Sequence, residues 1–293
     1  MPYFKKGNAR IYFLEQGKGF PIITIHGLIE NTAYWRLKGV ADMLASEYQI
    51  ISMDMRGHGN TRVLGHPPGF DEETVVSDII ALADHLGFDR FHLLTHSTGG
   101  FAAVRHAMHD CSRFASLILT NTGSFTSPVD GDEEKIRNFH EKLARSFEDQ
   151  SWEEMVEALK DFPGPFFRGI VESEASSELL QAALEMIRQN NRQEIARFVR
   201  SFYKDPDPCR EGLGQVSCPT LIIYGQKDDM FIESSRLMAE CIPRAQLLEY
   251  EGVGHMTAIE APRRLARDIL AFLRSVHQEE KGSSFTVQDV QAK

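Results

Sequence analysis

The sequence lacks the features that mark membrane-spanning, disulfide-rich and zinc-binding proteins. It has no run of about 18 uncharged apolar residues, which excludes a membrane-spanning helix. The segment from Met1 to Arg10 is charged and has no apolar stretch, so we expect no secretory signal there. Its four cysteines are far apart and form no Cys-x-x-Cys pair, which argues against a disulfide framework and a zinc site. We therefore expect a protein of the reducing cytoplasm.

Basic residues are also in deficit. The 32 lysines and arginines are outnumbered by 42 aspartates and glutamates, which gives a formal net charge of −10. Proteins that bind nucleic acids draw most of their affinity from a basic face that neutralises phosphates. This sequence has only short basic runs such as Arg263-Arg264, which we expect on solvated helix faces. The charge pattern therefore predicts no nucleic-acid partner.

What is present is typical of a globular α/β protein. The 293 residues allow one or two domains, and 42% of them are hydrophobic. In the first half of the chain, short apolar runs rich in β-branched residues alternate with amphipathic stretches. A helix is predicted at Asp71 to Leu86, with Asp71 as its N-cap. Strands are predicted at 20–26, 48–53, 90–95 and 115–120. This alternation predicts a parallel sheet with helices on both faces.

The pattern changes in the second half. From about residue 130 to 214 the sequence is helical and poor in strands, and aromatic residues are scattered through it. Strands then resume at 219–224 and 247–250, followed by an amphipathic helix at 263–276. We predict an α/β core made of residues 1–124 and 215–277, a helical cap at 125–214, and a flexible C-terminal tail at 278–293.

Ser97 is a candidate nucleophile. It lies in the string Thr95 to Gly100, which follows a predicted strand and opens a helix. A serine on such a sharp turn projects its hydroxyl above the sheet edge, where the helix N-terminus stabilises negative charge. Gly99 allows the close crossing of strand and helix, but Thr95 replaces the first glycine of the G-x-S-x-G pattern. A serine at this point is also common as a simple helix cap.

A base and an acid are available at the same sheet edge. His255 lies on a glycine-rich loop after the last predicted strand, and loops after parallel strands converge on one crevice. His96 adjoins the serine, but its side chain should leave the turn in another direction, so we expect it to pack. Asp228 and Asp229 follow the strand 219–224. Either could orient the imidazole, and either could simply form a turn.

Two backbone N–H groups are candidates for binding an oxyanion. The turn His26-Gly27 ends an early predicted strand and places the N–H of Leu28 near the crevice. The N–H of Thr98 follows the serine at the start of the helix. Acyl-transfer sites need such a pair of donors, whereas an isolated glycine such as Gly27 more commonly marks an ordinary turn.

Together these segments resemble the α/β-hydrolase superfamily, in its serine-nucleophile branch with a helical cap. The resemblance rests on the chain order Ser97, Asp228, His255 and on segments that resemble the family's oxyanion, D-x-R-G-x-G, acid and histidine motifs. These segments are His26-Gly27 with Trp35, Asp54 to Gly59, Gly225 to Asp228, and Gly254-His255 with Glu260 and Pro262. The resemblance implies that Asp228 is the acid. The string His96 to Gly100 is similar to arylesterases and cofactor-free haloperoxidases, whereas epoxide hydrolases and dehalogenases of this architecture use an aspartate nucleophile.

The resemblance implies a serine hydrolase that cleaves a carboxylic ester, lactone or related acyl compound, with apolar character, through an acyl-enzyme. No metal or organic cofactor is implied. Perhydrolase activity, carbon–carbon bond hydrolysis and a non-catalytic ligand sensor are the alternatives. The candidate substrate-binding residues are His26, Trp35, Phe125, Trp152, Phe166, Met230 and Met256.

Overall fold

The computed structural model describes residues 2–124, 133–203 and 210–288. Their strands form one sheet in the order β1-β2-β4-β3-β6-β7-β8-β9, and β5 pairs with β2. The strands are β1 Tyr3–Lys6, β2 Ala9–Gln16, β3 Pro21–Ile25, β4 Gln49–Met53, β5 Arg62–Val63, β6 Phe91–His96, β7 Phe114–Thr120, β8 Thr220–Gly225 and β9 Ala245–Tyr250. From β4 to β9 neighbouring strands are parallel, whereas β1, β2 and β5 pair antiparallel.

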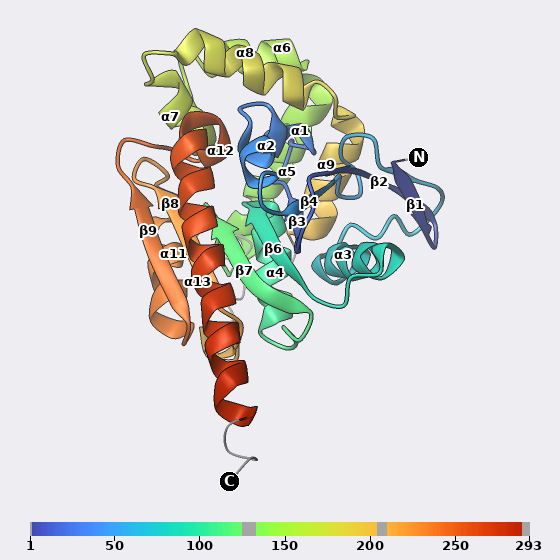
Figure 1. Ribbon diagram of the computed structural model, residues 1–293. Coiled ribbons are helices and arrows are strands. Elements are labelled where there is room, and N and C mark those ends of the chain that lie inside the picture. The colour runs from blue at the N-terminus through green and yellow to red at the C-terminus, as the bar shows by residue number, and fades with distance from the viewer. Residues whose placement is uncertain (1, 125–132, 204–209, 289–293) are drawn as a thin grey trace.

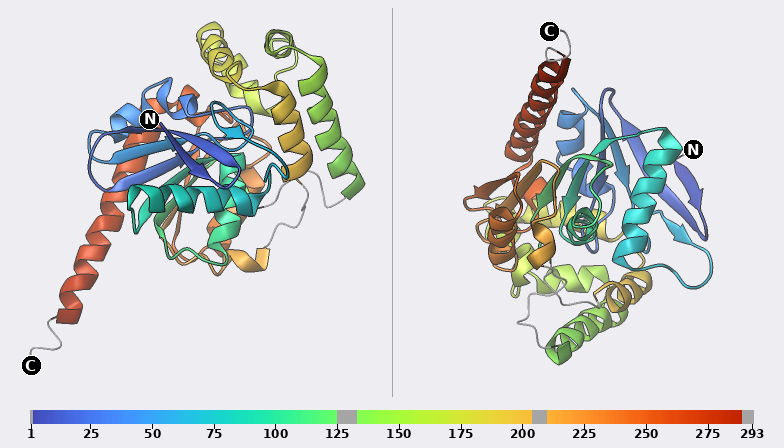
Figure 2. Two further views of the ribbon diagram at one scale, coloured as in Figure 1. Left: turned by 90° about the vertical axis from the view of Figure 1, so that its right-hand side faces the viewer. Right: turned by 90° about the horizontal axis from the view of Figure 1, so that it is seen from below.

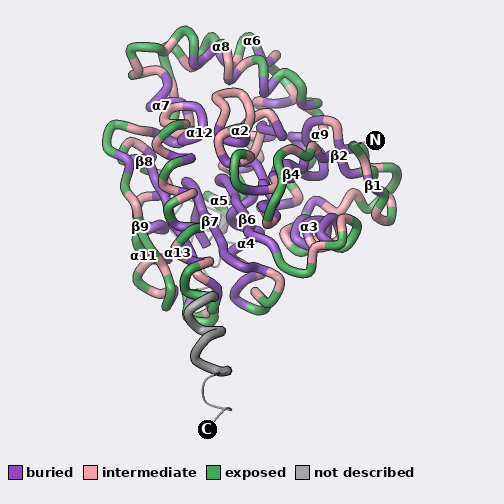
Figure 3. The backbone as a smooth tube through the Cα atoms, viewed as in Figure 1, coloured by how far each residue is buried: buried purple, intermediate pink, exposed green. Residues whose placement is uncertain are grey.

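Helices cover both faces of this sheet (Figures 1 and 2), which confirms the predicted α/β class. One face packs on α1 Ala33–Arg36, α2 Val40–Leu44, α12 Thr257–Glu260 and α13 Pro262–Gln288. The other face packs on α3 Glu72–Leu86, α4 Thr98–Ala107 and α11 Ile232–Cys241. Successive residues of one strand face opposite ways, so Ile22 of β3 joins the first core and Ile23 the second. Burial is therefore continuous along the central strands (Figure 3).

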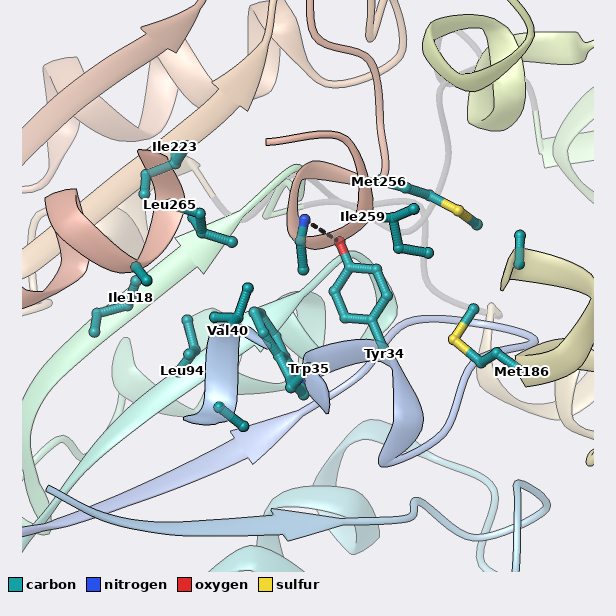
Figure 4. Packing of buried hydrophobic residues seen from close by; sticks show 14 of the residues in the cluster. Tyr34, Trp35, Val40, Leu94, Ile118, Met186, Ile223, Met256, Ile259 and Leu265 are labelled. Atoms are coloured by element: carbon teal, nitrogen blue, oxygen red, sulfur yellow. Dashed lines mark hydrogen bonds between the residues drawn. The ribbon is translucent and has the colours of Figure 1, made fainter. Parts of the chain in front are cut away.

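The helices between β7 and β8 lie over one end of the sheet. They are α5 Glu133–Asp149, α6 Trp152–Ala158, α7 Gly164–Val171, α8 Ser176–Ile187, α9 Arg192–Phe202 and α10 Arg210–Leu213. Figure 4 shows how they join the core: Met186 of α8 lies near the Tyr34 ring, as do Met256 and Ile259. The Tyr34 hydroxyl accepts a hydrogen bond from the N–H of Ala258. The start of the predicted cap, at 125–132, lies outside the described residues.

The turn after β4 fixes the loop that follows β3. Asp54 accepts hydrogen bonds from the N–H of Thr32 at 2.6 Å and from the N–H of Asn60 at 2.7 Å. Gly59 approaches this carboxyl group so closely that a Cβ there would lie 2.1 Å from an Asp54 oxygen. The two loops are thereby held together at the carboxyl ends of the parallel strands, where the candidate site lies.

The structure tests two helix ends that the sequence predicts, the start of the helix at 71–86 and the end of the helix at 263–276. Asp71 caps α3 by accepting a hydrogen bond from the N–H of Thr74, as predicted. The helix α13 continues to Gln288, so the predicted flexible tail begins inside a helix. Within the described part of the chain, no helix combines the length and apolar character needed to cross a membrane.

Candidate active site

Ser97 lies on a strained turn between β6 and α4. Its φ is 46° and its ψ is −117°, a conformation that costs a non-glycine residue on the order of 1–3 kcal/mol. Hydrogen bonds on both sides hold the turn: the Ser97 N–H donates to the carbonyl of Thr120 at 3.0 Å, and the Ser97 carbonyl accepts from the Thr122 hydroxyl at 2.7 Å. The Ser97 side chain makes no capping hydrogen bond to α4, and Ser97 lines the cavity described below.

The neighbours of Ser97 explain how this turn is accommodated. A Cβ on Gly99 would lie 2.5 Å from Cγ2 of Ile25 and 2.7 Å from the carbonyl oxygen of His26, so only glycine fits. Thr95, which departs from the usual motif, points its hydroxyl at the neighbouring strand and donates to the carbonyl of Ile118 at 3.1 Å. The threonine at the position of the usual glycine therefore has its hydroxyl satisfied by a hydrogen bond within the sheet.

His255 is paired with Asp228. The Nδ1 atom of His255 lies 2.8 Å from Oδ2 of Asp228, and both side chains are buried. The same carboxylate oxygen accepts a hydrogen bond from the Asn121 amide at 2.8 Å. Burial lowers the pKa of His255, but the negative charge of Asp228 and the hydrogen bond to it outweigh burial and raise this pKa above its ordinary value. The pair is therefore built to stabilise a protonated imidazole.

The loop that carries His255 is held by Glu260. One oxygen of this carboxyl group accepts from the N–H of Gly254 at 2.7 Å, and the other accepts from the N–H of Met256 at 3.0 Å. The His255 ring itself stacks on Phe231, with ring centroids 5.3 Å apart. Glu260 therefore fixes the backbone on both sides of His255, and Phe231 packs against its ring.

The two adjacent aspartates lie in different surroundings. Asp228 is fully buried against His255. Asp229 has a side chain that is 68% exposed and pairs with Arg168 at 2.7 Å. Of the two candidates that the sequence left open, only Asp228 contacts the imidazole.

Ser97 and His255 line the same cavity of about 200 Å³, together with Leu28 and Thr98. Neither the Leu28 N–H nor the Thr98 N–H finds a hydrogen-bond acceptor among the described residues. The site therefore offers a hydroxyl, an imidazole and two unengaged backbone donors at one place.

Apolar side chains from the helices between β7 and β8 form much of the cavity wall. These are Phe139, Leu143, Phe147, Met155, Leu159, Phe166 and Phe167. Of the candidate substrate-binding residues, the structure places Phe166, Met230 and Met256 in this lining. Phe125 lies outside the described residues.

The other three candidates lie elsewhere for identifiable reasons. His26 is buried beside the turn, with its Nε2 accepting from the N–H of Met55 at 3.0 Å and its Nδ1 2.7 Å from the carbonyl of Gly27. Trp35 packs in the core against Tyr34. Trp152 packs among the helices and donates from its indole to the carbonyl of Asn190 at 3.1 Å. These three side chains pack behind the cavity and are not among the described residues that line it.

Glu30 is a cavity residue that the sequence did not reveal. It is almost fully buried, and its carboxyl group accepts from the N–H of Gly27 at 2.6 Å. A Cβ added to Gly27 would lie 3.0 Å from this carboxyl oxygen and also 3.0 Å from Cβ of Ser97, so the carboxyl group and the Ser97 side chain are close neighbours. Burial raises the pKa of Glu30 to about 8, with the Gly27 hydrogen bond and His255 acting in the opposite direction. A turn residue three positions after a glycine gives no sequence signal of this burial.

Tyr203 and His140 are two further cavity residues that sequence reasoning missed. The Tyr203 hydroxyl lies 2.5 Å from the hydroxyl of Thr98, and its ring stacks on His140. Both come from the helical region, where the sequence pattern reports only amphipathic helices. Among the described residues, no group of three or more His, Cys, Asp or Glu side chains is arranged to hold a metal ion.

Comparison with known proteins identifies the family. Residues 21–262 match the family described as alpha/beta hydrolase fold. The chain belongs to this family. The match spans both halves of the sheet and the helices between them, and it confirms the resemblance and the fold class expected from the sequence.

The chain is similar to proteins that are named for several different activities. It is 28% identical over 256 residues to the dihydrolipoyllysine-residue acetyltransferase component of the acetoin cleaving system of Pseudomonas putida, a match that covers 87% of this chain but 64% of that protein. It is 26% identical to the non-heme chloroperoxidase CPO-A1 of Kitasatospora aureofaciens, covering 92% of this chain and 97% of that one. A thermophilic esterase from Thermogutta terrifontis superposes with a TM-score of 0.72 at 25% identity, covering 92% and 94%.

Proposed function

We propose that this chain is a serine hydrolase in which Ser97 is the nucleophile, His255 the general base and Asp228 the group that orients the imidazole. One observation carries the proposal: Asp228 holds Nδ1 of His255 at 2.8 Å, while His255 and Ser97 line one cavity. With the ring proton on Nδ1, Nε2 is free to accept a proton from a hydroxyl. Membership of a family that includes esterases and peroxidases agrees with this chemistry.

The proposed reaction has two stages. The Ser97 oxygen attacks the acyl carbonyl, its proton passes to Nε2 of His255, and the N–H groups of Leu28 and Thr98 bind the oxyanion. The tetrahedral intermediate expels the alcohol, which takes the proton from His255, and an acyl-enzyme remains. A water molecule then gives a proton to His255 and attacks the acyl group, which releases the acid and restores the Ser97 hydroxyl. The raised pKa of His255 favours the imidazolium that both stages require.

The substrate we propose is an uncharged ester, lactone or related acyl compound. The described residues that line the cavity include no lysine or arginine, and most are apolar. An anionic substrate would therefore lose its hydration in this cavity without gaining a charged partner. Glu30 is the acidic side chain of the lining, and its raised pKa keeps it neutral below about pH 8.

Hydrolysis of p-nitrophenyl esters of graded chain length, together with fluorophosphonate labelling, tests the proposal. Labelling and turnover should be present in the wild type and lost in Ser97→Ala and His255→Ala. Ser124→Ala is the matched control, because this buried hydroxyl has no hydrogen-bond partner among the described residues. Turnover that survives in Ser97→Ala would contradict the proposal, and tight ester binding without labelling would favour a sensor. Rates that rise only with hydrogen peroxide would favour a perhydrolase.

A further inference from the structure

A polar strip runs up one wall of the cavity from the nucleophile turn. It starts at the hydroxyl of Thr98, continues through the Tyr203 hydroxyl at 2.5 Å, and ends at His140, whose ring lies parallel to that of Tyr203. The two ring centroids are 4.6 Å apart, and the ring planes differ by 12°. Since Tyr203 follows α9 and His140 belongs to α5, the strip links two helices to the residue next to Ser97.

The last member of this strip is unsatisfied. His140 lines the cavity and is 6% exposed, yet its Nδ1 atom has no hydrogen-bond partner among the described residues. A buried polar atom without a partner is expensive, and native proteins keep few of them. Burial lowers the pKa of His140 to about 4, so the imidazole is neutral near pH 7 and has one donor and one acceptor nitrogen.

Among the described cavity-lining residues of α5, α6 and α7, His140 has the polar side chain. Its neighbours on α5 that line the cavity are Phe139, Leu143 and Phe147, and the described lining residues of α6 and α7 are also apolar or glycine. An apolar acyl chain can lie against these side chains. A polar atom of that chain that reaches the imidazole of His140 would supply the hydrogen-bond partner that the buried Nδ1 lacks.

We infer that His140 recognises an uncharged hydrogen-bonding group, such as a ketone, hydroxyl or amide, on the acyl chain of the substrate, away from the bond that is cleaved. The inference rests on the proposed serine-hydrolase function. It makes the substrate an ester or lactone whose acyl part is neither a plain hydrocarbon nor an anion. A site that leaves a polar atom unpaired when the group is missing discriminates strongly in favour of the substituted chain.

Pairs of substrates separate this inference from the proposed function. The p-nitrophenyl esters of hexanoate and octanoate are compared with their oxo derivatives of equal length, in which the ketone moves one carbon at a time from carbon 4 outward. Hydrolysis of the plain esters tests the serine-hydrolase function. The ratio of kcat/KM for substituted over plain esters tests the role of His140. For the best isomer we expect a preference of about tenfold.

His140→Phe keeps a flat ring against Tyr203 and removes both ring nitrogens, so the preference should fall to about one. His140→Gln retains a neutral donor and acceptor and should keep part of it. Lys142→Ala, an exposed position of the same helix, should leave the ratio unchanged, and thermal melting of each variant reports folding. If no isomer is preferred by the wild type, or if His140→Phe keeps the preference, the inference is overturned. Should His140→Phe not fold, loss of preference in a folded His140→Leu variant decides in its favour, and retention decides against it.

Discussion

The carboxyl group of Glu30 lies 3.2 Å from Nε2 of His96, in the buried wall beside Ser97. The hydrogen bonds around His96 fix where the proton is. The Thr120 hydroxyl donates to the carbonyl of Thr95, so it accepts from Nδ1 of His96 at 3.1 Å. Burial lowers the pKa of His96 well below its usual value, which leaves Nε2 bare. A carboxylate beside a bare nitrogen would be repelled, so Glu30 fits this position as the neutral acid.

The contribution of Glu30 to the stability of the protein should therefore decrease as the pH rises from about 4.5 to about 8, and Glu30→Gln should remove this contribution. Burial raises the pKa of Glu30 from 4.5 to about 8, so in this interval the folded chain holds a proton that the unfolded chain has released. Stability decreases with pH wherever the folded state binds more protons. Glutamine keeps the shape, accepts from Gly27 and remains neutral.

Urea unfolding of both proteins at low and high pH measures this effect. Near pH 5 they should be about equally stable, and near pH 8.5 Glu30→Gln should be more stable by on the order of 3 kcal/mol. An equal dependence on pH in the two proteins would show that Glu30 does not hold this proton.

The activity should have a bell-shaped dependence on pH with two assigned limbs. His255 acts as a base only when neutral, and its pKa is raised by Asp228 against the effect of burial, so kcat/KM should rise with pH through a value above 6.5. Above about pH 8, ionised Glu30 places a negative charge beside the site of the oxyanion, so kcat/KM should fall again.

Measuring kcat/KM from pH 5 to 10 for wild type and Glu30→Gln separates the limbs. The acid limb should remain in the variant and the alkaline fall should be absent. A fall of equal size in both proteins would assign the alkaline limb to another group.

Asp228→Asn should be far more harmful than Asp229→Asn, although the residues are adjacent. The first change removes the charge that raises the pKa of His255 and allows the wrong ring tautomer, which should lower kcat by about 10³–10⁴-fold. The second change removes an exposed pair with Arg168, and such pairs contribute little. Steady-state kinetics of the two variants against one ester gives the comparison, and losses of similar size would contradict the proposed role of Asp228.

The parallel part of the fold could be predicted from sequence because its strands are buried on both faces. A run such as 20–26 is continuously apolar and ends at a glycine, which is the pattern of a central parallel strand. The antiparallel strands β1, β2 and β5 were not predicted. Alternate residues of β2 reach solvent, and β5 has two residues, so neither forms a continuous apolar run.

The site could be predicted where a residue directly follows a strand, and not where its role comes from burial. Ser97, Asp228 and His255 each follow a strand, so the topology brings them to one edge. Glu30 and His140 acquire their properties from side chains that the fold places around them. The contact of Thr98 with Tyr203 spans 105 positions of the chain, and no local pattern encodes such a contact.

Gly169→Ala should lower both activity and stability, against the usual trend for a helix. Alanine is normally favoured over glycine within a helix by about 1 kcal/mol. Gly169 lies in α7, however, where a Cβ would be 2.0 Å from an oxygen of Glu260 and 2.6 Å from the nitrogen of Gly254. Glu260 holds the loop of His255 through two hydrogen bonds. The clash therefore displaces α7 or moves the imidazole, and small misplacements of a catalytic group can cost about 100-fold in rate.

The matched control is Arg168→Ala on the same helix. Its side chain is partly exposed and pairs with Glu172 and Asp229, so its loss should change the free energy of unfolding by less than about 1 kcal/mol. Thermal melting and ester hydrolysis of the two variants measure the difference. If Gly169→Ala melts higher than wild type and hydrolyses esters at the same rate, then α7 does not hold the histidine loop in place, because the helix propensity of alanine would have acted without opposition.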